Sequence, residues 1–152
     1  MFTRVLTDTD AAAFRQIRRD ALDAEAKERG TEPAWMEESL LVLADWFKTK
    51  WSGQSGFFVG AFDPALVGII FCARDAKLSA LYVMPKHRER GIGRRLLLDT
   101  VARAKEWFDL ERIWLDVAAT NTRARELYLS CGFYIIGPGK LDGEDRIELD
   151  LR

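Results

Sequence analysis

A glycine-containing segment near the middle of the chain has the residue types of a phosphate-binding loop. Arg88 is followed at fixed spacing by Gly91 and Gly93, between an apolar run that ends at Val83 and an amphipathic run. Glycine lets the backbone turn sharply and approach a ligand closely because it has no Cβ atom. The first amides of a helix have no intrahelical acceptor and lie at its positive dipole end, where they bind anions. Basic side chains that add favourable charge surround the glycines: Lys86, His87, Arg88, Arg90, Arg94 and Arg95. The segment therefore predicts a phosphate site.

Two common phosphate-binding motifs do not fit this segment. A Walker loop needs the pattern GxxxxGK[ST], which is absent from the chain. The dinucleotide fingerprint needs a third small residue, and this chain has Leu96 at that position.

A second segment with chemical potential follows the apolar run from Leu115 to Val117. The pattern is Asn121-x-x-Ala124-x-x-Leu127-Tyr128-x-x-x-Gly132-Phe133. On a helix, Tyr128 would lie about two turns after Asn121 and on nearly the same face. Both side chains could therefore line one groove.

Together the two segments resemble the acetyl-CoA site of the GNAT superfamily of N-acetyltransferases. The first is Leu81-x-Val83-x-Pro85 followed by Arg88-x-x-Gly91-x-Gly93, and the pair spans residues 81–133. The resemblance implies acetyl-CoA as cosubstrate, with no metal, and cofactor contacts at Val83, Arg88, Glu89, Arg90, Gly91, Ile92, Gly93, Arg94 and Asn121. It also implies that two parallel strands, 77–83 and 112–117, splay apart so that the pantetheine arm pairs with their backbone.

The same resemblance implies an acetyl transfer without a covalent enzyme intermediate. The backbone N–H near Val83 would polarise the thioester carbonyl, and an amine would attack it directly. Tyr128, whose ordinary pKa is about 10, is protonated at neutral pH and would donate to the departing thiolate.

Some of these residues have simpler interpretations. Tyr128 could be a core residue, Asn121 only a helix N-cap, and the arginines a solvated face. Glu89 stands where the family often has glycine and puts a negative charge beside the expected phosphates. Some relatives carry acids where this chain has Ser79 and Ala80. The general base is therefore open, with these candidates besides a water chain: Glu37, Glu38, Asp75 and Asp116.

The acceptor is expected to be a small-molecule or peptide amine. Residues 20–45 hold eight acidic side chains against Lys27 and Arg29, and a surface of this charge would attract a cation such as a polyamine, an amino sugar or a lysine-like amine. A solvated acidic helix pair would have the same composition. The acids are Asp20, Asp23, Glu25, Glu28, Glu32, Glu37, Glu38 and Asp45. The strands after Phe133 could form the edge of a homodimer.

Periodicity and turn residues predict the element order βααβββαβαββ. Strands are expected at Phe2–Thr7, Phe57–Phe62, Leu66–Ala73, Lys77–Val83, Arg112–Val117, Phe133–Ile136 and Arg146–Leu151. Helices are expected from Asp8 or Thr9 to Gly30, from Pro33 to Lys50, from Gly91 to Phe108 and from Asn121 to Ser130. The central strand–helix–strand unit implies parallel pairing, and the hairpins imply antiparallel pairing. The expected class is α+β: a mixed, mostly antiparallel twisted sheet with helices on both faces, in one domain over residues 1–152.

Composition excludes several other classes. The chain has 152 residues and a formal net charge of −1, which argues against a nucleic-acid or anionic-membrane surface. No apolar run reaches the roughly 20 residues of a membrane span, and no secretory signal is visible. Cys72 and Cys131 form no metal or disulfide motif, so a cytoplasmic location is expected. Two alternatives to catalysis stay open: a non-catalytic acyl-CoA or amine binder, and nucleic-acid binding by residues 86–95.

Overall fold

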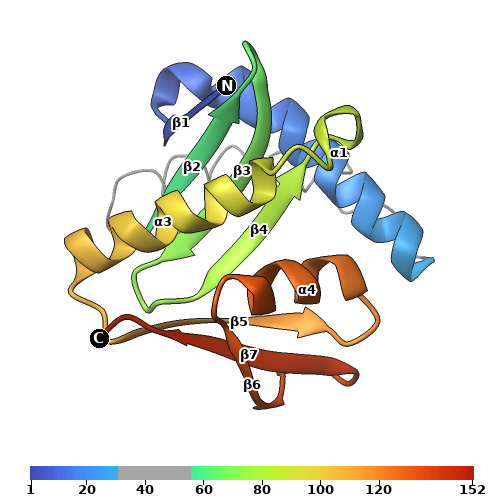
Figure 1. Ribbon diagram of the computed structural model, residues 1–152. Coiled ribbons are helices and arrows are strands. Elements are labelled where there is room, and N and C mark those ends of the chain that lie inside the picture. Colours follow the sequence, from blue (N-terminus) through green and yellow to red (C-terminus); the bar gives the residue numbers. More distant parts are fainter. Residues whose placement is uncertain (31–55) are drawn as a thin grey trace.

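The computed structural model describes residues 1–30 and 56–152, and its strands form two antiparallel sheets (Figure 1). The strand order is β1-β2-β3-β4 in the first sheet and β5-β7-β6 in the second. The first sheet consists of β1 Phe2–Val5, β2 Gly56–Phe62, β3 Leu66–Ala73 and β4 Leu78–Val83. The second consists of β5 Arg112–Ala118, β6 Tyr134–Pro138 and β7 Glu144–Asp150.

The two sheets join where β4 and β5 begin. The Trp114 N–H donates to the Ala76 carbonyl at 3.0 Å, and Lys77 and Trp114 form an isolated parallel bridge. Beyond this bridge the described parts of β4 and β5 share no ladder, and the two strands diverge in Figure 1. The predicted splay of two central parallel strands is therefore confirmed.

Helices cover both faces of the first sheet, as expected. These helices are α1, Ala11–Arg29, and α3, Ile92–Phe108, whereas α4, Thr122–Ser130, lies over the second sheet (Figure 1). Every residue of β2 is buried, because its side chains alternate between two covered faces. Phe57 packs in the cluster that contains Leu96 of α3, and Phe58 packs against Phe14 of α1. Tyr128 of α4 lies in the α3 cluster.

The N-terminal elements differ in detail from the prediction. The expected strand over 2–7 ends at Val5, and the expected helix cap at Asp8 or Thr9 is instead a short 3₁₀ turn, Asp8–Asp10. The reason is Asp10, which accepts from the Thr7 amide at 2.7 Å and binds Arg4 through two bonds of 2.8 Å. These bonds fix a turn between Thr7 and Asp10, and the α-helix begins only after it.

The remaining element boundaries lie within two residues of the predicted ones. The strand Leu66–Ala73 is as predicted, and α1 ends as expected at Gly30, whose φ is 64°. The expected helix over 33–50 lies outside the described residues. Within the described ranges, none of the helices has the length and apolar content to cross a membrane.

Candidate active site

The end of β4 presents backbone groups to the side on which β5 diverges. Met84 N–H donates to Val67 C=O at 2.8 Å, so Val67 and Met84 form a hydrogen-bonded pair. The next pair along the ladder is Gly68 with Val83. Because hydrogen-bonded and non-bonded pairs alternate in an antiparallel ladder, the Val83 N–H and C=O both point away from β3. The predicted oxyanion donor is thus directed toward the splay.

A bulge in β4 precedes this strand end. Ser79 pairs with Phe71 and Tyr82 with Ile69, so Ala80 and Leu81 stand opposite one residue. Ala80 has φ 59°, a conformation that costs a residue with a Cβ atom free energy. Bulges bend a strand and redirect its groups, often beside active sites.

The loop after β4 carries a run of unpaired backbone donors. From Glu89 to Arg94 no amide donates a hydrogen bond within the described chain, and the next amide, of Arg95, donates to Gly91 C=O at 3.0 Å. Glu89 and Gly91 have positive φ values of 64° and 77°. Alternating backbone conformations of this kind bring successive N–H groups into an anion-binding concavity. These amides are the backbone donors that the predicted phosphate site needs, and we call residues 88–94 the anion loop.

Three arginines of this segment contact other protein groups. Arg88 Nε donates to Val83 C=O at 2.9 Å, and Arg94 Nη1 donates to Ser130 Oγ at 3.2 Å. Arg90 Nη1 lies 3.8 Å from Asp63 Oδ2. Arg88 and Arg94 keep their positive charge, because a carbonyl and a hydroxyl are neutral partners, and of these three arginines Arg90 alone lies near a carboxylate in the described chain.

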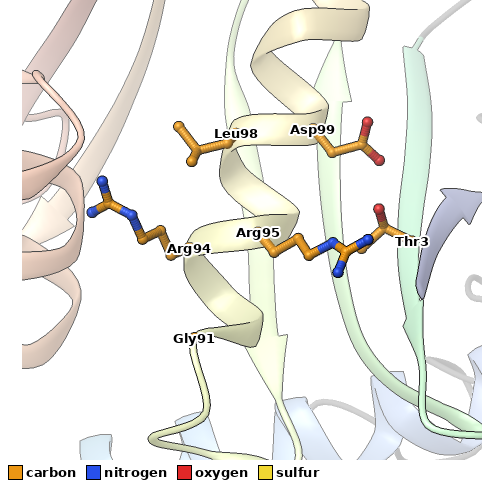
Figure 2. Close-up of a pocket in the computed structure, with 6 residues that line it drawn as sticks. All are labelled: Thr3, Gly91, Arg94, Arg95, Leu98 and Asp99. Carbon is orange, nitrogen blue, oxygen red and sulfur yellow. The ribbon is translucent and has the colours of Figure 1, made fainter. Parts of the chain in front are cut away.

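A shallow, open cavity of about 490 Å³ lies on the outer face of α3 (Figure 2). Arg94 points to one side of the helix and Arg95 to the other, toward Thr3. The other lining residues are Gly91, Leu98 and Asp99. The cavity borders the anion loop at Gly91, but it does not include Val83 or Tyr128.

Glu89 reaches from the anion loop to α4. Its Oε1 atom lies 3.4 Å from Nη2 of Arg123 in the first turn of that helix, and both side chains are exposed. Arg123 was not among the predicted site residues. A readable signal existed, because a basic residue is unfavourable near a helix N-terminus unless an anion compensates it.

Tyr128 is buried beside the diverging strands. It lies in the hydrophobic cluster of Val117 and Phe133, against which Val83 also packs, and its ring meets that of Phe133 edge-on. Burial raises the pKa of Tyr128, so its hydroxyl stays protonated at neutral pH. No hydrogen bond to this hydroxyl occurs in the described part of the chain. Both the packing and the acid interpretation of Tyr128 fit this environment.

The other predicted contacts have clear structural roles. Asn121 caps α4, since its Oδ1 atom accepts from the Ala124 amide at 3.3 Å. Ile92 is buried, so only its backbone could meet a ligand. A Cβ atom on Gly93 would lie 3.4 Å from Leu127 Cδ2, an ordinary van der Waals distance, so the packing around Gly93 does not by itself require a glycine.

Of the four candidates for the general base, the structure describes Asp75 and Asp116, and neither is well placed or well suited to accept a proton from the amine. Arg146 holds Asp116 through bonds of 2.9 and 3.1 Å, and this lowers the pKa of the carboxyl. Asp116 is therefore a poor base. Asp75 lies in the turn before β4, at the opposite end of the strand from Val83. Glu37 and Glu38 lie outside the described residues.

Comparisons with known proteins agree with this geometry. A sequence profile described as the acetyltransferase (GNAT) family matches residues 14–133. An uncharacterised N-acetyltransferase of Mycobacterium tuberculosis H37Rv is 39% identical over 64 residues, 42% of this chain and 40% of that protein. The match thus spans less than half of that relative's length.

Solved structures share the fold over nearly the whole chain. The PaiA N-acetyltransferase of Thermoplasma acidophilum, in complex with coenzyme A, has TM-score 0.77 at 21% identity over 99% of each chain. The spermidine N-acetyltransferase of Vibrio cholerae, in complex with CoA and spermine, has TM-score 0.73 at 19% identity and covers 98% of this chain and 94% of its own. Since the family profile covers most of the sequence and the strands, loop and helices have this arrangement, the chain belongs to the acetyltransferase (GNAT) family.

Proposed function

We propose that this chain transfers an acetyl group from acetyl-CoA to a primary amine. The observation that carries the proposal is the presence of two sets of unpaired backbone donors close together in the chain: the Val83 N–H at the splay and the amides of residues 89–94. The residues fit acetyl-CoA, because the loop amides suit a pyrophosphate and the unpaired strand edge suits the amides of pantetheine.

The chain's groups have distinct tasks in the proposed reaction. Acetyl-CoA supplies an acetyl group activated as a thioester. Val83 N–H donates to the thioester oxygen and stabilises the negative charge that develops there. The amine nitrogen forms the new C–N bond as the C–S bond breaks, and Tyr128 gives its proton to the sulfur. The cationic amine loses one proton before it attacks and a second as the C–N bond forms, both to water or to a base outside the described residues, and Tyr128 regains a proton from water before the next turnover.

The acceptor we propose is a cationic amine. Burial is the largest cause that raises the pKa of Tyr82, and the charges of Asp20 and Asp23 on α1 raise it further. These carboxylates therefore lie near the residue that precedes Val83, and they would attract an ammonium group to this face. Glu25 and Glu28 are also on α1, and the other four acids of the segment lie outside the described residues. The spermidine enzyme among the structural neighbours acts on an amine of this class.

An acceptor screen tests the proposal. The protein is incubated with acetyl-CoA and a panel of polyamines, amino sugars, lysine derivatives and peptides, and thiol release is followed. We expect turnover with a cationic amine that falls as salt rises and falls in Asp20→Asn with Asp23→Asn. Coenzyme A binding by calorimetry, without turnover on any amine, would instead show a non-catalytic binding protein. Nucleic-acid binding that coenzyme A does not compete away would contradict the proposal.

A further inference from the structure

The Arg88 side chain turns back from the anion loop to the end of β4. Its Nε atom donates to Val83 C=O at 2.9 Å in a partly buried position. Its guanidinium carbon lies 5.5 Å from the centre of the Tyr82 ring. This side chain therefore lies at the thioester end of the proposed site. The run of unpaired amides that suits a phosphate begins at Glu89, after Arg88, and it can bind an anion without the Arg88 guanidinium.

Arg88 completes the anchoring of one peptide group. The N–H of the Val83–Met84 peptide donates to Val67 at 2.8 Å, and the carbonyl of the same peptide accepts from Arg88. The Val83 N–H and C=O point the same way, because Val83 stands in a non-bonded pair of the ladder. The Val83 N–H belongs to the preceding peptide group, so the bond to the carbonyl does not orient it directly. It holds the backbone at Val83 in the extended conformation in which both groups face the splay.

The positive charge of Arg88 supports the same task as its hydrogen bond to Val83, which is to stabilise the thioester oxygen. A guanidinium bonded to the Val83 carbonyl lies close to any oxygen that accepts from the Val83 N–H. A positive charge so placed favours negative charge on that oxygen, and the effect is strongest where water is excluded.

We propose that Arg88 is a positioning residue for the thioester carbonyl, which acts by holding Val83, and is not a phosphate ligand. The inference rests on the proposed function, and it deepens it by assigning the motif arginine to the reacting end of the cofactor. A phosphate ligand would contribute mainly to cofactor affinity. A positioning residue contributes mainly to polarisation of the carbonyl and to kcat.

The variants Arg88→Met, Arg88→Gln and Arg88→Lys test this assignment. Arg88→Met keeps much of the length and removes the donor, and Arg88→Lys keeps the charge and a donor. Arg103→Gln is the control, since Arg103 is an arginine of α3 that is paired with Asp99 and is not among the predicted cofactor contacts. Calorimetry gives the Kd of coenzyme A. Infrared difference spectra of bound acetyl-CoA labelled with ¹³C at the thioester carbonyl give its polarisation without any acceptor amine.

We expect the Kd of coenzyme A to stay within about two-fold of wild type in Arg88→Met, while kcat falls by roughly ten-fold or more. The carbonyl stretch, lowered on binding to wild type, should return toward its free value in Arg88→Met and Arg88→Gln. Arg88→Lys should restore part of the shift, and Arg103→Gln should keep all of it.

Two results would overturn the inference: a wild-type carbonyl frequency in folded Arg88→Met, or a rise of ten-fold or more in its Kd for coenzyme A. If Arg88→Met does not fold, a wild-type frequency in Arg88→Gln does the same. Wild-type protein that binds and polarises acetyl-CoA but acetylates no amine would count against the proposed function and leave the Arg88 assignment standing.

Discussion

Replacing Glu89 by glutamine should tighten the binding of coenzyme A. The Glu89 carboxylate belongs to the loop whose amides from residue 89 to residue 94 are unpaired, and it is bonded to Arg123 at 3.4 Å. An anion on these amides would lie beside a like charge. Glutamine removes that charge, keeps the size of the side chain and leaves the Arg123 guanidinium free to face the anion.

The size of the effect follows from simple electrostatics. At a separation of about 7 Å in water, one carboxylate repels a doubly charged pyrophosphate by about 1 kcal/mol at low salt. This corresponds to roughly a five-fold decrease in Kd. The Glu89 and Arg123 side chains are 83% and 62% exposed, so losing their ion pair should cost less than about 1 kcal/mol of stability.

Glu89→Gly makes a useful second variant. The positive φ of 64° at Glu89 costs a residue with a Cβ atom roughly 1 kcal/mol, which glycine would recover. Glycine also loses more backbone entropy on folding, by about 0.5–1 kcal/mol. The two contributions nearly cancel, so any large gain in affinity should appear in both variants and be due to the lost charge.

Calorimetric titration with coenzyme A at low and high salt measures the effect, with Arg123→Gln and the double variant completing a cycle. Wild type and Glu89→Gln should approach each other as salt rises, because salt screens the repulsion. Arg123→Gln should weaken binding more in the Glu89→Gln background, where the guanidinium is free. An unchanged or increased Kd in Glu89→Gln at low salt would refute the placement of the pyrophosphate on these amides.

Three further predictions concern other parts of the molecule. Tyr128→Phe should lower kcat at least about ten-fold with little change in the Kd of coenzyme A, and an unchanged kcat would leave Tyr128 a packing residue. Because burial raises the pKa of Tyr128, wild-type activity should show no loss from tyrosine ionisation below about pH 10. The hydrogen bond from Arg146 lowers the pKa of Asp116, so this carboxylate stabilises the fold above its unfolded pKa of about 3.9 and loses that effect as pH falls through its lower folded pKa. Asp116→Asn should therefore cost about 2 kcal/mol at neutral pH and flatten the acid side of a thermal-unfolding profile, and equal midpoints at pH 7 would contradict this. We also propose a homodimer through the edge strand β6, where Ile136 is 48% exposed. Ile136→Lys should then shift the sedimentation of the protein toward that of a monomer. A wild-type protein that sediments as a monomer would exclude the dimer.

The glycine loop could be read from sequence because its requirements are local. Gly91 has the left-handed conformation that a sharp turn into a helix demands, and Asn121 caps the helix that its side chain predicts. Apart from the N-terminal strand and turn, the described strand and helix boundaries followed from hydrophobic period and turn residues, which depend on neighbours in the chain. The parallel approach of β4 and β5 followed from the strand–helix–strand order, but their divergence followed from the resemblance, since nothing in two apolar runs says that they separate after one bridge.

The directions of long side chains could not be read in this way. Arg88 and Arg90 look equivalent in the sequence, yet one bonds the end of β4 and the other lies near Asp63 in a turn far away in the chain. Their partners are set by tertiary packing, so a count of basic residues could not say which of these side chains face a phosphate. Asp116 was a candidate base for the same reason, because its partner Arg146 is on another strand.

The bulge at Ala80 explains why the Val83 amide is available at all. If the register that pairs Phe71 with Ser79 continued without the extra residue, Val67 would pair with Val83. Val67 occupies a hydrogen-bonded position of the ladder, so the Val83 N–H would then be bound to β3. One additional residue reverses the alternation and turns this N–H toward the splay, while Tyr82 moves to the α1 face. Alanine has no preference for the left-handed conformation that this requires, so the sequence carries no local signal of it. The strain at Ala80 is thus part of how the strand presents its donor.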